Sequence, residues 1–313
     1  MADIKLLLTL SENWTLIDPR DLPGQVQMAV AAEQAGFDGV IISDHIVLGQ
    51  GADSNGEPFN IREFVGPGTQ HPSTAWPSNI VLMSGIAART SRIRILSTAM
   101  IAPLRHPLLL AKELATLDLL AQGRLVVLPT VSWHESEYQA LQVPFRRRGR
   151  ILDEQLKVMR TVWAGSPASF RGDFYEFENV WLEPGPYRAG GPTLWFGGGA
   201  VNDNMLRRLV EYGSGFMGTG PTSPEDLARI ADAMRAAGRD LSELEFIGGL
   251  VGRFESPDSV ADLDGALSTL ERQLVRGVRS FVIKPSQFLD DLARLPEFLA
   301  EVVEKTSRVA EGF

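Results

Sequence analysis

The chain has 313 residues, of which 44% are hydrophobic and 22% charged, a composition typical of a globular protein. Its 39 acidic side chains outnumber the 30 basic ones and give a net charge of −9, which argues against nucleic acid or an anionic membrane as a partner. There is no cysteine, so disulfides, thiol catalysis and zinc–thiolate sites are excluded. The four histidines show no ligand spacing, so no metal site is predicted.

The amino terminus and the hydropathy pattern favour a cytoplasmic location. Residues 1–10 lack the basic segment and the small-residue cleavage site of a secretory signal. No apolar run reaches the ~20 residues that are needed to cross a bilayer. We therefore expect a cytoplasmic protein without a membrane partner.

Short β-branched runs alternate with amphipathic helices along the whole chain. The expected strands are residues 4–10, 39–43, 93–99, 125–129, 193–196, 215–218, 245–251 and 280–284. The expected helices are residues 21–36, 76–89, 107–121, 149–163, 202–212, 223–237, 259–275 and 289–309. Two stretches, 47–77 and 165–192, are too long for plain connections and indicate functional loops.

Eight such units predict an α/β fold, a single (β/α)8 TIM barrel over residues 1–313 with long insertion loops at its C-terminal face. A doubly wound sheet is the alternative, but residues 11–14, after the first strand, lack the glycine-rich turn of that fold. In a barrel the active site lies at the C-terminal ends of the strands. This rule selects His45, residues 98–101, 130–135 and 197–200, Thr219, Arg253 and Lys284.

Two of these strand ends have recognisable chemistry. His45 follows a buried strand and Asp44, and a histidine can exchange protons near neutral pH, so it is the candidate catalytic residue. The alternative is a structural histidine bonded to Asp44. Gly197, Gly198 and Gly199 precede a predicted helix, where exposed backbone N–H groups suit an anion. The alternative there is a flexible turn.

Several sequence words occur together in one known family. They are Arg89-Thr90-Ser91-Arg92-Ile93-Arg94, Pro103-Leu104-Arg105-His106-Pro107, Ala111-Lys112-Glu113-Leu114-Ala115-Thr116-Leu117-Asp118, Gly123-Arg124-Leu125, Trp133-x-x-x-Glu137, Arg148-Gly149, Asp153-Glu154, Ser43-Asp44-His45 and Trp195-Phe196-Gly197-Gly198. In this combination the chain resembles luciferase-like flavin- and deazaflavin-dependent oxidoreductases. The resemblance covers most of the chain and thins after about residue 220.

The resemblance implies that the ring system of a coenzyme binds at the strands' C-terminal mouth, with Asp44 and His45 as the catalytic pair beside it. Deazaflavin members carry a cis, non-proline peptide after strand three, and alignment on Pro103 places it at Ala99–Met100. The expected coenzyme contacts are Asp44, Ser97, Thr98, Ala99, Met100, Thr130, Ser132, Gly197, Gly198 and Gly199. The expected substrate pocket contains Trp133, His134 and His71, both histidines being solvent-exposed.

Strand four departs from the family pattern. Members of the family usually have the sequence Gly-x-Gly-x-Gly-Trp here. This chain has Leu128, Thr130 and Ser132 at the three glycine positions. Glycines let a flat ring or a phosphate approach the backbone. Their replacement predicts that the floor of the coenzyme site, formed by strand four, has a different shape. Trp133 also stands where some deazaflavin dehydrogenases place a catalytic glutamate, with His134 or Glu135 as weak substitutes.

Three functions follow, in order of preference. The first is hydride transfer between coenzyme F420 (8-hydroxy-5-deazaflavin) and a small, moderately hydrophobic organic substrate. The second is an FMN-dependent monooxygenase that receives reduced flavin from a partner reductase. The third, of another class, is a non-catalytic coenzyme-binding barrel. A flavin or F420 reductase is a possible partner, and the resemblance suggests a homodimer.

Overall fold

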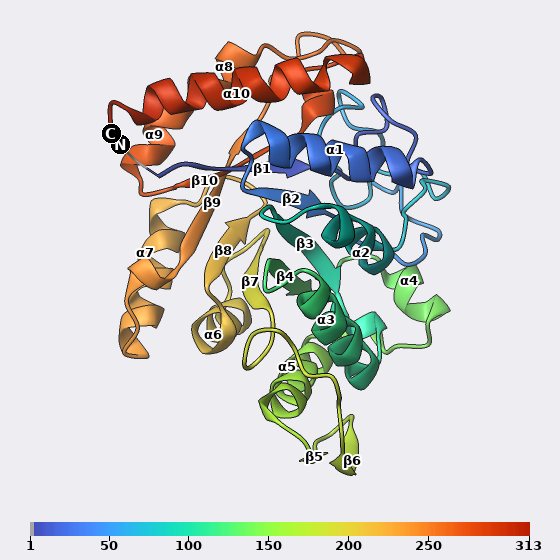
Figure 1. Ribbon diagram of the computed structural model, residues 1–313. Helices are drawn as coiled ribbons and strands as arrows, with labels where there is room; N and C mark the ends of the chain where they lie inside the picture. Colours follow the sequence, from blue (N-terminus) through green and yellow to red (C-terminus); the bar gives the residue numbers. More distant parts are fainter. Residues whose placement is uncertain (1–2) are drawn as a thin grey trace.

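The computed structural model describes residues 3–313 and contains a closed barrel of eight parallel strands. Around the barrel the strands follow the order β1-β10-β9-β8-β7-β4-β3-β2 (Figure 1). These strands are β1 (Lys5–Thr9), β2 (Gly39–Ile42), β3 (Arg94–Ile101), β4 (Leu125–Thr130), β7 (Thr193–Gly198), β8 (Gly215–Gly218), β9 (Glu245–Leu250) and β10 (Ser280–Ile283). The predicted TIM barrel is confirmed.

Helices surround the barrel on its outside (Figure 1). They are α1 (Leu22–Ala35), α2 (Asn79–Arg89), α3 (Pro107–Leu120), α4 (Glu135–Ala140), α5 (Arg148–Ala164), α6 (Asp203–Tyr212), α7 (Pro224–Ala236), α8 (Leu263–Leu267), α9 (Leu270–Val275) and α10 (Leu295–Ala310). Their ends carry ordinary capping signals. Ser223 accepts the Asp226 N–H at the start of α7, and Gly36, with φ 97°, ends α1.

Each strand buries both of its faces, and this explains the continuous apolar runs of the sequence. In β1, Leu7 belongs to the cluster that fills the barrel interior, whereas Leu6 and Leu8 pack outward against the helices. The interior cluster also contains Ile41, Leu96, Val126, Leu128, Trp195, Ile247 and Val282. Alternate residues point to opposite faces, so a parallel strand between two packed layers is apolar throughout.

Two predicted segments differ from the structure. The stretch 165–192 contains an antiparallel hairpin, β5 (Ala168–Arg171) and β6 (Glu176–Val180), which lies beside α5 (Figure 1). It leaves the end of α5 and leads into the start of β7, so it begins and ends at the N-terminal face of the barrel. Its turn is held by Glu154 of α5, which accepts the N–H groups of residues 173–175.

The helix expected over residues 259–275 is two short helices, α8 and α9. Between them the hydroxyls of Ser268 and Thr269 donate to the carbonyls of Gly265 and Ala266. Such local side-chain bonds compete with the helical pattern. Within residues 3–313 no helix is long and apolar enough to cross a membrane.

Candidate active site

The stretch 47–77, here called the mouth loop, lies at the C-terminal end of the barrel and is bound to four strand-end connections. After β9, the carbonyls of Ser256 and Ser259 accept from Asn60 at 2.9 Å each. After β10, Lys284 donates to the carbonyl of Glu63 at 2.8 Å. After β1, Glu12 accepts the Val65 N–H at 3.0 Å. After β4, His134 accepts the Gly49 N–H at 2.8 Å.

These contacts divide the barrel mouth into two halves. The covered half contains the ends of β9, β10 and β1, which the mouth loop contacts, and the end of β2, which leads into that loop. The contact after β4 lies at the border with the other half. The open half contains the ends of β3, β4, β7 and β8, where Thr98, Thr130, Gly198 and Gly218 are partly exposed. The strands of each half are neighbours around the barrel, so the open half is one continuous surface.

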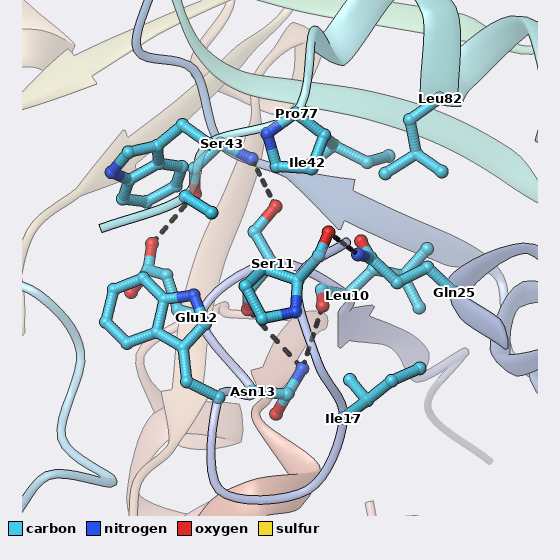
Figure 2. Close-up of a pocket in the computed structure, with 14 residues that line it drawn as sticks. Leu10, Ser11, Glu12, Asn13, Ile17, Gln25, Ile42, Ser43, Pro77 and Leu82 are labelled. Atoms are coloured by element: carbon cyan, nitrogen blue, oxygen red, sulfur yellow. Dashed lines mark hydrogen bonds between the residues drawn. The ribbon is translucent and has the colours of Figure 1, made fainter. Parts of the chain in front are cut away.

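A small cavity remains in the covered half (Figure 2). Its volume is about 20 Å³, and Glu12, Trp14, Ser43 and Trp76 are among its lining residues. Figure 2 shows Ser43 bonded through its N–H to the Ser11 hydroxyl at 2.9 Å and through its own hydroxyl to Glu12 at 2.9 Å. This space holds roughly one water molecule, so it is too small for a coenzyme ring.

Strand β3 bulges at the open half. The register of β3 against β4 shifts between Thr98 and Met100, and the peptide bond Thr98–Ala99 is cis. The expected position, Ala99–Met100, is therefore wrong by one residue. Alignment on Pro103 assumed an unchanged count of residues back to the strand, whereas the bulge leaves Ala99 without a partner in β4.

The bulge directs two of the four predicted coenzyme contacts of β3 toward the barrel interior. Thr98 is paired with the interior residue Leu128, and Ala99 packs against the interior cluster. The Thr98 hydroxyl is buried and has no hydrogen-bond partner. Ser97 and Met100 point outward. Ser97 is fully buried and accepts from Asn79 of α2 at 3.0 Å, and Met100 packs among the helices.

Asp44 is buried and its carboxylate is used to hold β3. Both of its oxygens bind the guanidinium of Arg105, at 2.8 and 2.9 Å, and one also accepts the Ile101 N–H at 2.9 Å. Asp44 therefore anchors the chain immediately after the bulge. The alternative interpretation, in which His45 is bonded to Asp44, is wrong because His45 bonds to a different carboxylate.

That carboxylate belongs to Glu137 of α4, and it is completely buried. His45 Nδ1 lies 3.1 Å from Glu137 Oε2, and Glu137 Oε1 accepts the N–H groups of Ile46 and Val47 at 2.6 and 3.2 Å. His45 Nε2 lies 3.4 Å from Gln70 Nε2 of the mouth loop. The His45 side chain is 10% exposed, and a side chain so placed can exchange a proton with a bound molecule.

Strand four keeps a glycine-like backbone at one of its three altered positions. Ser132 adopts φ 56°, in the left-handed region that glycine favours. Leu128 fills the barrel interior, and Thr130 is half-buried at the open half. Of the three replacements, Leu128 therefore changes the shape of the predicted coenzyme site most, because its side chain occupies space that a glycine would leave free.

The glycines after strand β7 have different causes. A Cβ at Gly197 would lie 1.7 Å from the Met217 carbonyl oxygen of β8, so strand packing alone requires glycine there. Gly198 has φ 132°, and an added Cβ there would meet nothing within 4 Å. Gly199 is exposed. Only Gly198 and Gly199 thus leave backbone open toward the mouth.

The three predicted pocket residues do not form one group: the rings of Trp133 and His134 lie 4.8 Å apart, whereas His71 lies elsewhere on the surface. Trp133 is partly buried, and its ring lies edge-on to His45 at 6.3 Å. His71 is exposed and bonds to Ser73 at 2.6 Å. His134 was expected to be exposed but is 2% exposed. Burial lowers the pKa of His134 below its usual value, which favours the neutral ring that accepts from the mouth loop.

Sequence reasoning selected Lys284 as a strand-end residue but missed its environment. Its ammonium group is fully buried, 4.0 Å from Glu12 Oε2, and lies over the rings of Trp14 and Phe64. Burial lowers the pKa of Lys284 to about 8, and Glu12 opposes that change. Nothing in the local sequence links these residues, because β1 and β10 become neighbours only when the barrel closes. No cluster of metal-ligating side chains occurs within residues 3–313.

Comparison with known proteins finds relatives of this chain in both sequence and fold. A 213-residue stretch, 67% of this chain, is 30% identical to 51% of the FMNH2-dependent dimethylsulfone monooxygenase of Pseudomonas fluorescens. The chain thus spans about half the length of that curated relative.

Two solved structures share the fold. One is the coenzyme F420-dependent tetrahydromethanopterin reductase of Methanopyrus kandleri, with a TM-score of 0.67, 15% identity and coverage of 96% of this chain and 97% of that one. The other is an F420-dependent secondary alcohol dehydrogenase, with a TM-score of 0.67, 17% identity and coverage of 97% and 99%. Residues 6–251 match the sequence model of the luciferase-like monooxygenases. The chain belongs to the luciferase-like monooxygenase family.

Proposed function

We propose that this protein is an oxidoreductase that transfers a hydride between coenzyme F420 and a small organic substrate at the open half of the barrel mouth. The observation that supports this proposal is the position of His45 directly after β2. The neighbouring strand is β3, and its bulge contains Thr98 and Ala99. When bound, such a coenzyme accepts or donates the hydride. His45 supplies or removes the accompanying proton, as a general acid or base.

The residues of the open half fit a flat, polar-edged ring. The unpartnered Thr98 hydroxyl offers a hydrogen bond that no protein group uses. Ala99 adds a small apolar contact, and Gly198 and Gly199 leave the adjacent backbone uncovered. A buried polar group without a partner is unfavourable, so a ligand that bonds to Thr98 gains affinity. Two F420-dependent enzymes share the fold over nearly the whole chain, and a monooxygenase in complex with FMN shares it over 79% of the chain.

A second candidate is an FMN-dependent monooxygenase that uses reduced flavin from a partner reductase. It is favoured by the 30% identity to an FMNH2-dependent monooxygenase. In this function the same open half would hold the flavin, and His45 would serve the same proton exchange.

The coenzyme is tested by titrating the purified protein with F420 and, separately, with oxidised and reduced FMN. We expect saturable quenching of F420 fluorescence and weaker binding of both flavins. Tight binding of reduced FMN with no response to F420 would replace the first function by the second. Binding without turnover across panels of alcohols, aldehydes and enones would point to a coenzyme-binding protein without catalysis.

A further inference from the structure

Four side chains, His45 among them, form a row of hydrogen bonds that joins α4 to the mouth loop. Glu137 Oε2 contacts His45 Nδ1 at 3.1 Å, and His45 Nε2 contacts Gln70 Nε2 at 3.4 Å. Trp76 Nε1 donates to Gln70 Oε1 at 2.8 Å. Gln70 is 4% exposed and Glu137 is completely buried, so bulk water does not compete for the inner contacts.

The direction of the row can be worked out from Trp76. An indole N–H only donates, so the Gln70 oxygen must face Trp76. The Gln70 NH2 group then faces His45, and an NH2 group also only donates. His45 Nε2 must therefore be the acceptor in this contact, although at 3.4 Å it is the longest of the three. A neutral imidazole with an accepting Nε2 carries its proton on Nδ1.

The opposite end of the row leads to the same result. Glu137 Oε1 already accepts two backbone N–H groups, from Ile46 and Val47, and these hold the carboxylate in place. An ionised carboxylate only accepts, so its Oε2 requires a proton on the facing nitrogen, His45 Nδ1. Donor and acceptor requirements thus agree along the whole row.

We infer that Glu137 and Gln70 are positioning residues that fix His45 as the tautomer protonated on Nδ1, with the Nε2 lone pair directed toward the Gln70 amide. A molecule that reaches this nitrogen must replace the Gln70 NH2 group with a donor of its own. In terms of the proposed function, on which this consequence rests, the substrate class at His45 is one that carries a hydroxyl or N–H group. A group that only accepts, such as an ether or a ketone, complements this nitrogen only when Nε2 carries a proton.

The tautomer is measured by nitrogen NMR of protein labelled with ¹⁵N-histidine, without coenzyme, at pH 8.5, well above the ordinary titration range of histidine. Only four histidines contribute signals, and His45→Gln identifies the pair that belongs to His45. We expect a protonated Nδ1 and an unprotonated Nε2. An unprotonated Nδ1 in the wild-type protein overturns the inference.

Two substitutions together should reverse the donor and acceptor roles along this row of hydrogen bonds. In Glu137→Gln the amide oxygen stays with the backbone N–H groups, so its NH2 turns to Nδ1 and requires an acceptor there. In Gln70→Glu one carboxylate oxygen still accepts from Trp76 and the other requires a donor at Nε2. The double variant E137Q/Q70E therefore should carry the proton on Nε2, with each contact again complementary. An unchanged tautomer in the folded double variant contradicts the inference.

Gln70→Met is the matched control, and it still tests the inference if the double variant does not fold. It removes the contact at Nε2 but leaves Glu137 in place, so the Nδ1–H tautomer should persist. Loss of that tautomer in Gln70→Met means that Glu137 does not fix the ring. None of these measurements needs a coenzyme, so failure of the F420 titration leaves this result standing, and the reverse also holds.

Discussion

Asp44 and Arg105 form a buried ion pair in which each carboxylate oxygen binds one guanidinium nitrogen, while the same carboxylate accepts the Ile101 N–H. We expect Asp44→Asn to destabilise the protein by about 3 kcal/mol, because removal of one partner leaves a buried charge without compensation. Urea unfolding measures this loss. Asp18→Asn, which breaks an exposed pair with Arg20, is the control and should change stability little.

His45→Ala should lower turnover by about 100-fold or more, the usual contribution of a general acid or base. The fold should be retained because His45 lies at a strand end, although stability should fall, since the buried Glu137 carboxylate loses its side-chain partner. Steady-state kinetics with the bound coenzyme checks this, and His106→Asn is the control because His106 is exposed, caps α3 and packs against Tyr175. Normal turnover of His45→Ala would show that His45 takes no part in the reaction.

Thr98→Val should weaken coenzyme binding about fivefold, which corresponds to one lost hydrogen bond of about 1 kcal/mol. The free protein should be as stable as wild type or slightly more stable, because the buried hydroxyl has no partner to lose. Fluorescence titration and thermal unfolding measure the two effects, and Thr98→Ser is expected to keep wild-type affinity. Equal affinity in the valine and serine variants would remove Thr98 from the coenzyme site.

His134 should make the folded protein less stable as the pH falls into the acid range. Its pKa is lowered in the folded state by burial, from the ordinary 6.5. As pH falls below about 6.5, the unfolded chain takes up a proton that the folded protein does not, so the free energy of unfolding decreases. His134→Gln retains an acceptor for the Gly49 N–H but does not titrate. Between pH 5 and 6.5 urea unfolding should show a shallower loss of stability in this variant than in wild type.

Lys284 should make the stability of the folded protein depend on pH in the alkaline range. Between its folded pKa of about 8 and the ordinary value of 10.5, the unfolded chain holds a proton that the folded protein has released. The stability of wild type relative to Lys284→Met should therefore rise with pH over this window, by about 1.4 kcal/mol per unit. Unfolding at pH 8, 9 and 10 tests the trend, with Lys157→Met, on the exposed face of α5, as the control. A constant difference across the window would contradict it.

The sequence by itself determined the barrel and which residues lie at the C-terminal ends of its strands. Apolar runs such as residues 39–43 are readable because a strand buried on both faces needs apolar side chains at every position. Helix boundaries such as the start of α7 are readable because Ser223 and Pro224 cap the helix locally. The C-terminal ends of the strands then follow from chain direction alone, and His45, Thr98 and Lys284 lie there in the structure.

Only the tertiary structure decided which side chains work together there. His45 meets Glu137 across 92 positions of sequence, and Lys284 meets Glu12 only because the last strand closes against the first. Asp44, adjacent to His45 in sequence, instead binds Arg105. Propensity and periodicity report forces between near neighbours in the chain, whereas the partner of a buried charge depends on the closure of the barrel and on the path of the mouth loop over it.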